Sequence, residues 1–145
     1  IEWPVVVMLA AMIPVGQALE TSGISLNIAN FISASTAGMA LPWLILMILV
    51  ITMFVSDIVN NAATAVIMAP IAANLAIQVG QPVEPFLMAV AVGASCAFLS
   101  PIGHQCNTLV MGPGNYKFGD YWRLGLPLEC VIVAISIPMI LFVWT

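Results

Sequence analysis

Long apolar runs, interrupted at a few polar positions, dominate this sequence. Asp, Glu, Lys and Arg are absent from three stretches of at least 26 residues, namely 21–56, 58–83 and 85–116. About 20 consecutive apolar residues are enough for a helix to cross a bilayer, so these runs predict an all-α membrane protein. The polar interruptions divide the chain into a span at 3–19, an in-plane helix at 24–36, a hairpin at 42–79, a broken helix at 86–112 and a last span at 124–144.

The segment 24–36 is too polar to cross a membrane. Its apolar positions fall on one side of a helix and are Ile24, Ile28, Phe31 and Ile32. Such an amphipathic pattern is typical of a helix that lies in the interface, parallel to the membrane.

Polar residues interrupt the stretch 42–79 near its middle. Two apolar arms, 42–55 and 62–79, flank a group made of Ser56, Asp57, Asn60 and Asn61. Short arms with a short polar connection are typical of a re-entrant hairpin whose tip stops near the bilayer midplane. Two ordinary spans joined by a surface loop at 56–61 fit the same composition equally well.

A second interruption divides the stretch 86–112. Residues 86–99 make only about 21 Å of helix, whereas the hydrocarbon core is about 30 Å thick. Pro101 and Gly103 follow, and both favour an unwound backbone. An unwound segment at membrane depth must line a cavity or pack inside protein. One helix kinked at Pro101 is the simpler alternative.

Two such breaks in one chain favour discontinuous helices, which hold substrate and coupling ions in secondary transporters. The whole sequence of 145 residues is 6% charged, against about a quarter in soluble proteins, which excludes a soluble enzyme and a nucleic-acid-binding protein. A channel could use the same breaks as a selectivity filter. A single histidine, His104, four residues after Ser100, is a poor basis for an intramembrane enzyme.

Several other polar residues admit two interpretations each. Asp57 is a functional candidate because a carboxylate is costly to bury in a membrane, although a solvated position fits equally well. His104 could couple transport to protons, while such a residue more often hydrogen-bonds the backbone. Cys96, Cys106 and Cys130 are interpreted as buried small residues rather than a disulfide or metal set.

The residues at the two breaks resemble a known family. Residues 60–71, NNAATAVIMAPI, resemble the Ser-Asn-Thr hairpin motif of the divalent anion/sodium symporter family, within the ion transporter superfamily. Residues 100–107, SPIGHQCN, followed by Gly112, Pro113 and Gly114, resemble that family's unwound helix in the same repeat.

The resemblance implies the second of two inverted repeats of an elevator-type transporter, lacking the N-terminal repeat of the same permease. It implies a homodimer in the inner or plasma membrane that couples a sodium ion to a small anionic substrate, such as a dicarboxylate or sulfate. A proton-coupled or other inorganic-anion permease of the same superfamily, or an ion channel, is the alternative. Half of such a binding site is not expected to transport on its own.

The resemblance also implies site residues. Asn61 matches the motif asparagine, whereas Asn60 and Ala62 stand where the family usually has Ser and Thr. The implied substrate contacts are Asn60, Asn61, Pro101, Asn107 and Thr108. The implied sodium ligands, partly through backbone carbonyls, are Ser56, Asn61, Leu99, Ser100 and Gly103. Asn107 has an equally good explanation as a helix cap.

The only basic residues predict the orientation in the membrane. Lys117 and Arg123 both lie in the loop 113–123, which follows the broken helix. Because cytoplasmic loops carry an excess of basic residues, this loop is expected in the cytoplasm. The hairpin then enters from outside, and the last span exits outward.

Overall fold

The computed structural model describes residues 3–36 and 38–144, and regular structure within these ranges is entirely helical. The elements, in chain order, are α1 (Trp3–Thr21), α2 (Ile24–Ser35), α3 (Leu41–Ile58), α4 (Asn61–Gln78), α5 (Glu84–Ala94), α6 (Gln105–Met111), the short 3-10 helix η1 (Phe118–Asp120) and α7 (Tyr121–Trp144). The all-α prediction is confirmed.

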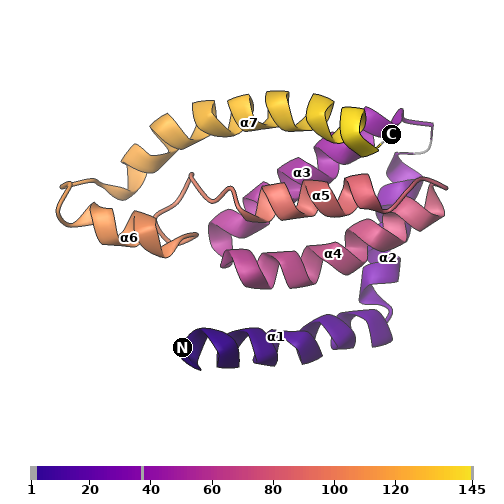
Figure 1. Cartoon of the computed structure of the whole chain (residues 1–145), viewed down its shortest axis with the longest axis horizontal. Coiled ribbons are helices and arrows are strands. Elements are labelled where there is room, and N and C mark those ends of the chain that lie inside the picture. Colours follow the sequence, from indigo (N-terminus) through magenta and orange to yellow (C-terminus); the bar gives the residue numbers. More distant parts are fainter. Residues whose placement is uncertain (1–2, 37, 145) are drawn as a thin grey trace.

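The centre of the protein is formed by α3, α4 and α5. In Figure 1, α1, α4, α5 and α7 follow the long axis, and α5 packs against α3, α4 and α7. Ile45, Leu49, Leu75 and Phe86 are fully buried where these helices meet. The tip between α3 and α4 lies at the same end of the molecule as α6. This arrangement brings both predicted breaks to one place.

Three helical segments among the described residues are long and apolar enough to cross a membrane: Leu41–Ile58, Asn61–Gln78 and Phe118–Trp144. In the last of these, only 6% of the apolar window is buried inside the protein. Large apolar residues such as Leu124 and Phe142 are exposed along it. A helix that is both apolar and exposed is suited to lipid. The chain is therefore part of a multi-pass membrane protein.

The predicted hairpin is present as α3 and α4, which are joined by Val59 and Asn60. Each arm has 18 residues, or about 27 Å of helix. An arm of this length can re-enter or cross, so re-entry stays a prediction.

The amphipathic segment forms α2, which runs across the ends of the other helices, opposite α6 (Figure 1). Ser25 and Ala29 are buried, and α2 packs on α4. Ile24, Ile28 and Phe31 are exposed. Small buried and large exposed residues suit a helix that packs closely on its neighbour and presents its apolar side to lipid. Its in-plane position stays a prediction.

Candidate substrate and cation site

Two adjacent asparagines at the tip between α3 and α4 have different partners. Asn60 is the N-cap of α4, and its side-chain oxygen accepts a hydrogen bond from the Ala63 amide at 2.9 Å. Asn61 begins α4, and its Oδ1 lies 3.1 Å from the Ser56 hydroxyl. The Asn60 oxygen thus caps a helix, whereas the Asn61 oxygen lies beside a buried hydroxyl.

A contact with this tip marks the point where α5 ends. The last helical residue is Ala94 instead of the predicted Leu99. In a continued α-helix the Ala94 carbonyl would accept from the Phe98 amide. It accepts instead from the Ser56 hydroxyl at 2.8 Å. The hairpin therefore supplies the partner that replaces the helical hydrogen bond.

Two carboxylates lie next to the backbone donors that the unwinding leaves free. The Leu99 amide donates to Asp57 Oδ1 at 2.9 Å, and the Ser100 hydroxyl donates to the Asp57 carbonyl at 2.6 Å. The Phe98 amide lies beside the carboxylate of Glu129, on α7. Because buried backbone groups require partners, these contacts stabilise the unwound segment 95–104. Asp57 is only 7% exposed, so the solvated interpretation is wrong.

Two glycines allow this segment to pack between the tip and α7. A Cβ at Gly103 would lie 2.7 Å from Ala97 Cβ and 2.9 Å from the Ser56 carbonyl oxygen. A Cβ at Gly125 would lie 2.5 Å from the Phe98 carbonyl oxygen. All three distances are too short for a real side chain, so glycine is required for this close approach.

On the other side of the unwound segment, side chains of α6 bind its carbonyls. The Asn107 amide donates to the carbonyls of Ala97 and Ser100 at 2.8 and 3.0 Å. The Thr108 hydroxyl donates to the Pro101 carbonyl at 2.6 Å. Each of these carbonyls therefore already accepts one hydrogen bond. Asn107 is not the N-cap of α6, because that position is His104.

The predicted residues thus form two groups. Ser56, Asn61, Ser100 and Gly103 gather around the tip, with Asp57 bonded to the Leu99 amide. Asn107 and Thr108 face the unwound segment from α6. Asn60 is exposed, and its side chain caps α4 instead of facing the other residues of the site. Among the described residues, the carbonyls of Leu99 and Gly103 accept no hydrogen bond, which leaves both available to a ligand.

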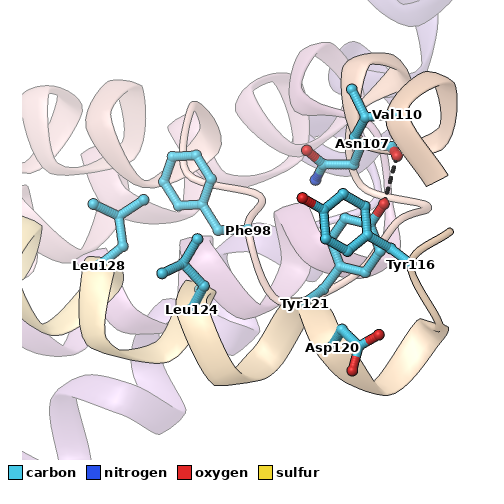
Figure 2. A pocket seen from close by; sticks show the side chains of 9 residues that line it. Phe98, Asn107, Val110, Tyr116, Asp120, Tyr121, Leu124 and Leu128 are labelled. Atoms are coloured by element: carbon cyan, nitrogen blue, oxygen red, sulfur yellow. Dashed lines mark hydrogen bonds between the residues drawn. The ribbon is translucent and has the colours of Figure 1, made fainter. Parts of the chain in front are cut away.

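A hollow of about 280 Å³ lies behind this site (Figure 2). It is lined by Phe98, Asn107, Val110, Tyr116, Asp120, Tyr121, Leu124, Gly125 and Leu128. The rings of Tyr116 and Tyr121 meet edge to face with centroids 6.2 Å apart, and the Tyr121 hydroxyl donates to the Asn107 carbonyl at 2.7 Å. Asn107 is the one predicted substrate contact that lines this hollow, and the apolar walls and aspartate that make up most of the rest do not suit an anion.

The histidine and the cysteines have modest roles. His104 is exposed, and its Nδ1 accepts from the Cys106 amide at 3.2 Å, which is the backbone role considered above. All three cysteines are free. Cys96 is buried as expected, but Cys106 and Cys130 are exposed, so that part of the interpretation is wrong. Among the residues that the structure describes, no cluster of three His, Cys, Asp or Glu side chains could hold a metal.

Glu129 and Gly125 were missed by the sequence interpretation. Both lie in the last span, outside the two motifs. The one available signal was that Glu129 is an acidic residue within an otherwise apolar span.

A helical hairpin whose tip contacts a broken helix, in a chain with exposed apolar helices, is the architecture of a membrane transport protein. Residues 1–93 match the citrate transporter family, and the chain belongs to this family.

Several curated proteins are similar to nearly the whole chain. An uncharacterized transporter of Synechocystis is 39% identical over 97% of the chain and 23% of its own length. A probable sodium/sulfate cotransporter of Chlamydomonas reinhardtii is 33% identical over 94% of the chain and 15% of its own length. A sodium-dependent high-affinity dicarboxylate transporter of Caenorhabditis elegans is 31% identical over 92% of the chain and 24% of its own length. The chain thus spans a quarter or less of these relatives.

Proposed function

We propose that the complete permease carries a small divalent anion, such as a dicarboxylate or sulfate, across the membrane together with sodium. The observation that carries this proposal is the pair of oxygens at the hairpin tip, Ser56 Oγ and Asn61 Oδ1, which are 3.1 Å apart. The relatives named for sodium/sulfate and sodium-dependent dicarboxylate transport support the same choice.

The tip suits a hard cation. A hydroxyl has one hydrogen, and that of Ser56 has two acceptors within reach, with the Ala94 carbonyl the closer at 2.8 Å. When the hydrogen is directed to Ala94, Ser56 and Asn61 present two acceptor oxygens to the same space. Hard cations prefer oxygen ligands. In this proposal Ser56 and Asn61 bind sodium with the segment Leu99–Gly103, through the backbone carbonyls of Leu99 and Gly103. The Ser100 hydroxyl, which already accepts from the Ile102 and Gly103 amides, would hold that segment in place.

The anion needs this cation because fixed positive charge is scarce. Lys117 and Arg123 are the only basic residues, and both are exposed. The N-terminus of α4 contributes only about 0.3–1 kcal/mol when exposed and up to ~2 when partly buried. Bound sodium is then the largest positive charge at the site. The anion is proposed to contact Asn60, Asn61, Pro101, Asn107 and Thr108 once sodium is bound.

The rest of the permease is part of the proposal. An N-terminal repeat with its own hairpin would complete the site, and two copies of the permease would form a homodimer. The chain covers 23% and 24% of the length of two relatives, and the remaining length of these proteins is ample for a second repeat.

Uptake by the full-length permease in proteoliposomes tests the function. We expect saturable uptake of radiolabelled succinate or sulfate with sodium outside, and little with choline. Asn61→Ala should raise the half-saturating sodium concentration about tenfold or more and weaken the anion as well, because coupling is reciprocal. Asn30→Ala, at an exposed position on α2, is the matched control.

Two results would contradict the proposal. Uptake driven by a proton gradient without sodium would favour the proton-coupled alternative. An unchanged sodium dependence in Asn61→Ala, with uptake retained, would place the cation elsewhere.

A further inference from the structure

Glu129 is a half-buried acid whose role the two motifs do not explain. It lies on α7, one turn after Gly125, and its Oε1 is buried with no hydrogen-bond partner among the described residues. On one side it borders a hollow of about 360 Å³ whose other lining residues, apart from Cys130, are apolar. A carboxylate in such surroundings is unfavourable unless another group compensates its charge.

A second acid lies close to it. Asp57 Oδ2 is also buried without a partner among the described residues, while Oδ1 accepts from the Leu99 amide at 2.9 Å. Glu129 lies beside the next amide, that of Phe98, and its carboxylate is near enough to feel the charge of Asp57. The two acids therefore flank one dipeptide, from α3 and from α7.

Nothing basic in the chain compensates this pair. Lys117 and Arg123 are the only basic residues, and both are exposed. The close approach of α7 at Gly125 places Glu129 at the unwound segment, whose Leu99 carbonyl is one of the proposed sodium ligands. If the proposed function holds, a cation bound at the tip would balance the two carboxylates.

We propose that Asp57 and Glu129 form a carboxylate pair that raises the affinity of the hairpin tip for its cation. This inference rests on the proposed function. Glu129 acts as a positioning residue that also determines affinity. Its negative charge attracts the cation, and the protein between them weakens this attraction only in part. Its position beside the Phe98 amide helps to orient the Leu99 carbonyl. Asp57 adds charge from the hairpin side. Neither acid needs to contact the cation, because a charge several ångströms away in protein still changes an affinity severalfold.

Isosteric neutralisation of Glu129 isolates the effect of charge. Glu129→Gln keeps the size of the side chain and an oxygen beside the Phe98 amide, and removes one negative charge. In full-length permease in proteoliposomes, we expect its half-saturating sodium concentration to rise about tenfold. The KM for the anion at saturating sodium should stay within twofold of the parent. Glu84→Gln, which neutralises an exposed acid at the start of α5, is the matched control and should leave both values unchanged.

Two further variants keep the test decisive. Glu129→Asp, which restores the charge, should recover most of the sodium affinity. Asp57→Asn, which keeps the acceptor for the Leu99 amide, should shift sodium in the same direction as Glu129→Gln and serves if that variant does not assemble. A role limited to packing would lower the thermal midpoint of the variants without this selective change in sodium affinity.

The outcomes separate this inference from the proposed function. Sodium-independent uptake by the parent permease would overturn the proposed function itself. Sodium-dependent uptake by the parent, with neither Glu129→Gln nor Asp57→Asn changing the sodium requirement more than twofold, would overturn only the role of the carboxylate pair.

Discussion

At the scale of single residues, Ser56 joins the two breaks of the chain. Its side chain is fully buried. Its hydroxyl lies within hydrogen-bond distance of the carbonyl of Ala94, the last residue of α5, and of the side-chain oxygen of Asn61, the first residue of α4. One small side chain therefore stabilises the unwinding and supplies an oxygen to the proposed cation site.

Replacement of Ser56 should affect stability and sodium binding together. Ser56→Ala leaves the buried Ala94 carbonyl without its partner, which costs about 1–3 kcal/mol. We expect a lower thermal midpoint for the purified full-length permease and a higher half-saturating sodium concentration. Ser56→Thr, which retains the hydroxyl, is the control. Equal values for Ser56→Ala and the parent would contradict this role.

Asn60 is expected to act mainly through the helix that it caps. Asn60→Ala removes the acceptor for the Ala63 amide and should cost about 1 kcal/mol, measured as a lower midpoint of thermal unfolding. Asn60→Ser should retain most of the stability because serine is also a good cap. A large loss of anion affinity in Asn60→Ser, with stability unchanged, would instead support direct contact with substrate.

At the scale of helices, local sequence signals account for the two apolar arms but not for the end of α5. The predicted arms, 42–55 and 62–79, lie close to α3 and α4, because a polar group between two apolar runs is a local signal. Pro101 and Gly103 correctly indicated unwinding. The break begins at Ser95, however, because Ser56, 38 residues earlier in the sequence, takes the Ala94 carbonyl. No local pattern could have predicted that contact.

The close packing of α7 on the unwound segment depends on Gly125. Gly125→Ala would place a methyl group 2.5 Å from the Phe98 carbonyl oxygen. The backbone must then move, and we expect a destabilisation of about 1–3 kcal/mol, seen as a lower thermal midpoint. Gly119→Ala, where a Cβ meets nothing within 4 Å, should leave the midpoint unchanged. Equal midpoints for the two variants would show that α7 does not pack as described.

At the scale of the whole molecule, the site combines contributions that are far apart in the sequence. Ser56, Asp57 and Asn61 could be predicted because they interrupt apolar runs. The inward direction of Asn107 and Thr108 and the approach of Glu129 depend on how α6 and α7 return to the hairpin. Such tertiary contacts have no signal in local composition.

Orientation in the membrane can be tested at Lys117. Because Lys117 and Arg123 are the only basic residues, we expect the loop that contains them to face the cytoplasm. A cysteine introduced by Lys117→Cys, in a cysteine-free full-length permease, should react with an impermeant maleimide only after the cells are opened. Labelling in intact cells would reverse the topology.

The bonding of the unwound segment has a consequence for amide hydrogen exchange. In its part 99–103, the Leu99 amide bonds Asp57, and the amides of Ile102 and Gly103 bond the Ser100 hydroxyl at 3.2 and 3.1 Å. Exchange at such amides requires local opening, and here opening would also release the hairpin tip. This stretch should therefore exchange deuterium slowly, as a helix does, although it has no helical hydrogen bonds of its own.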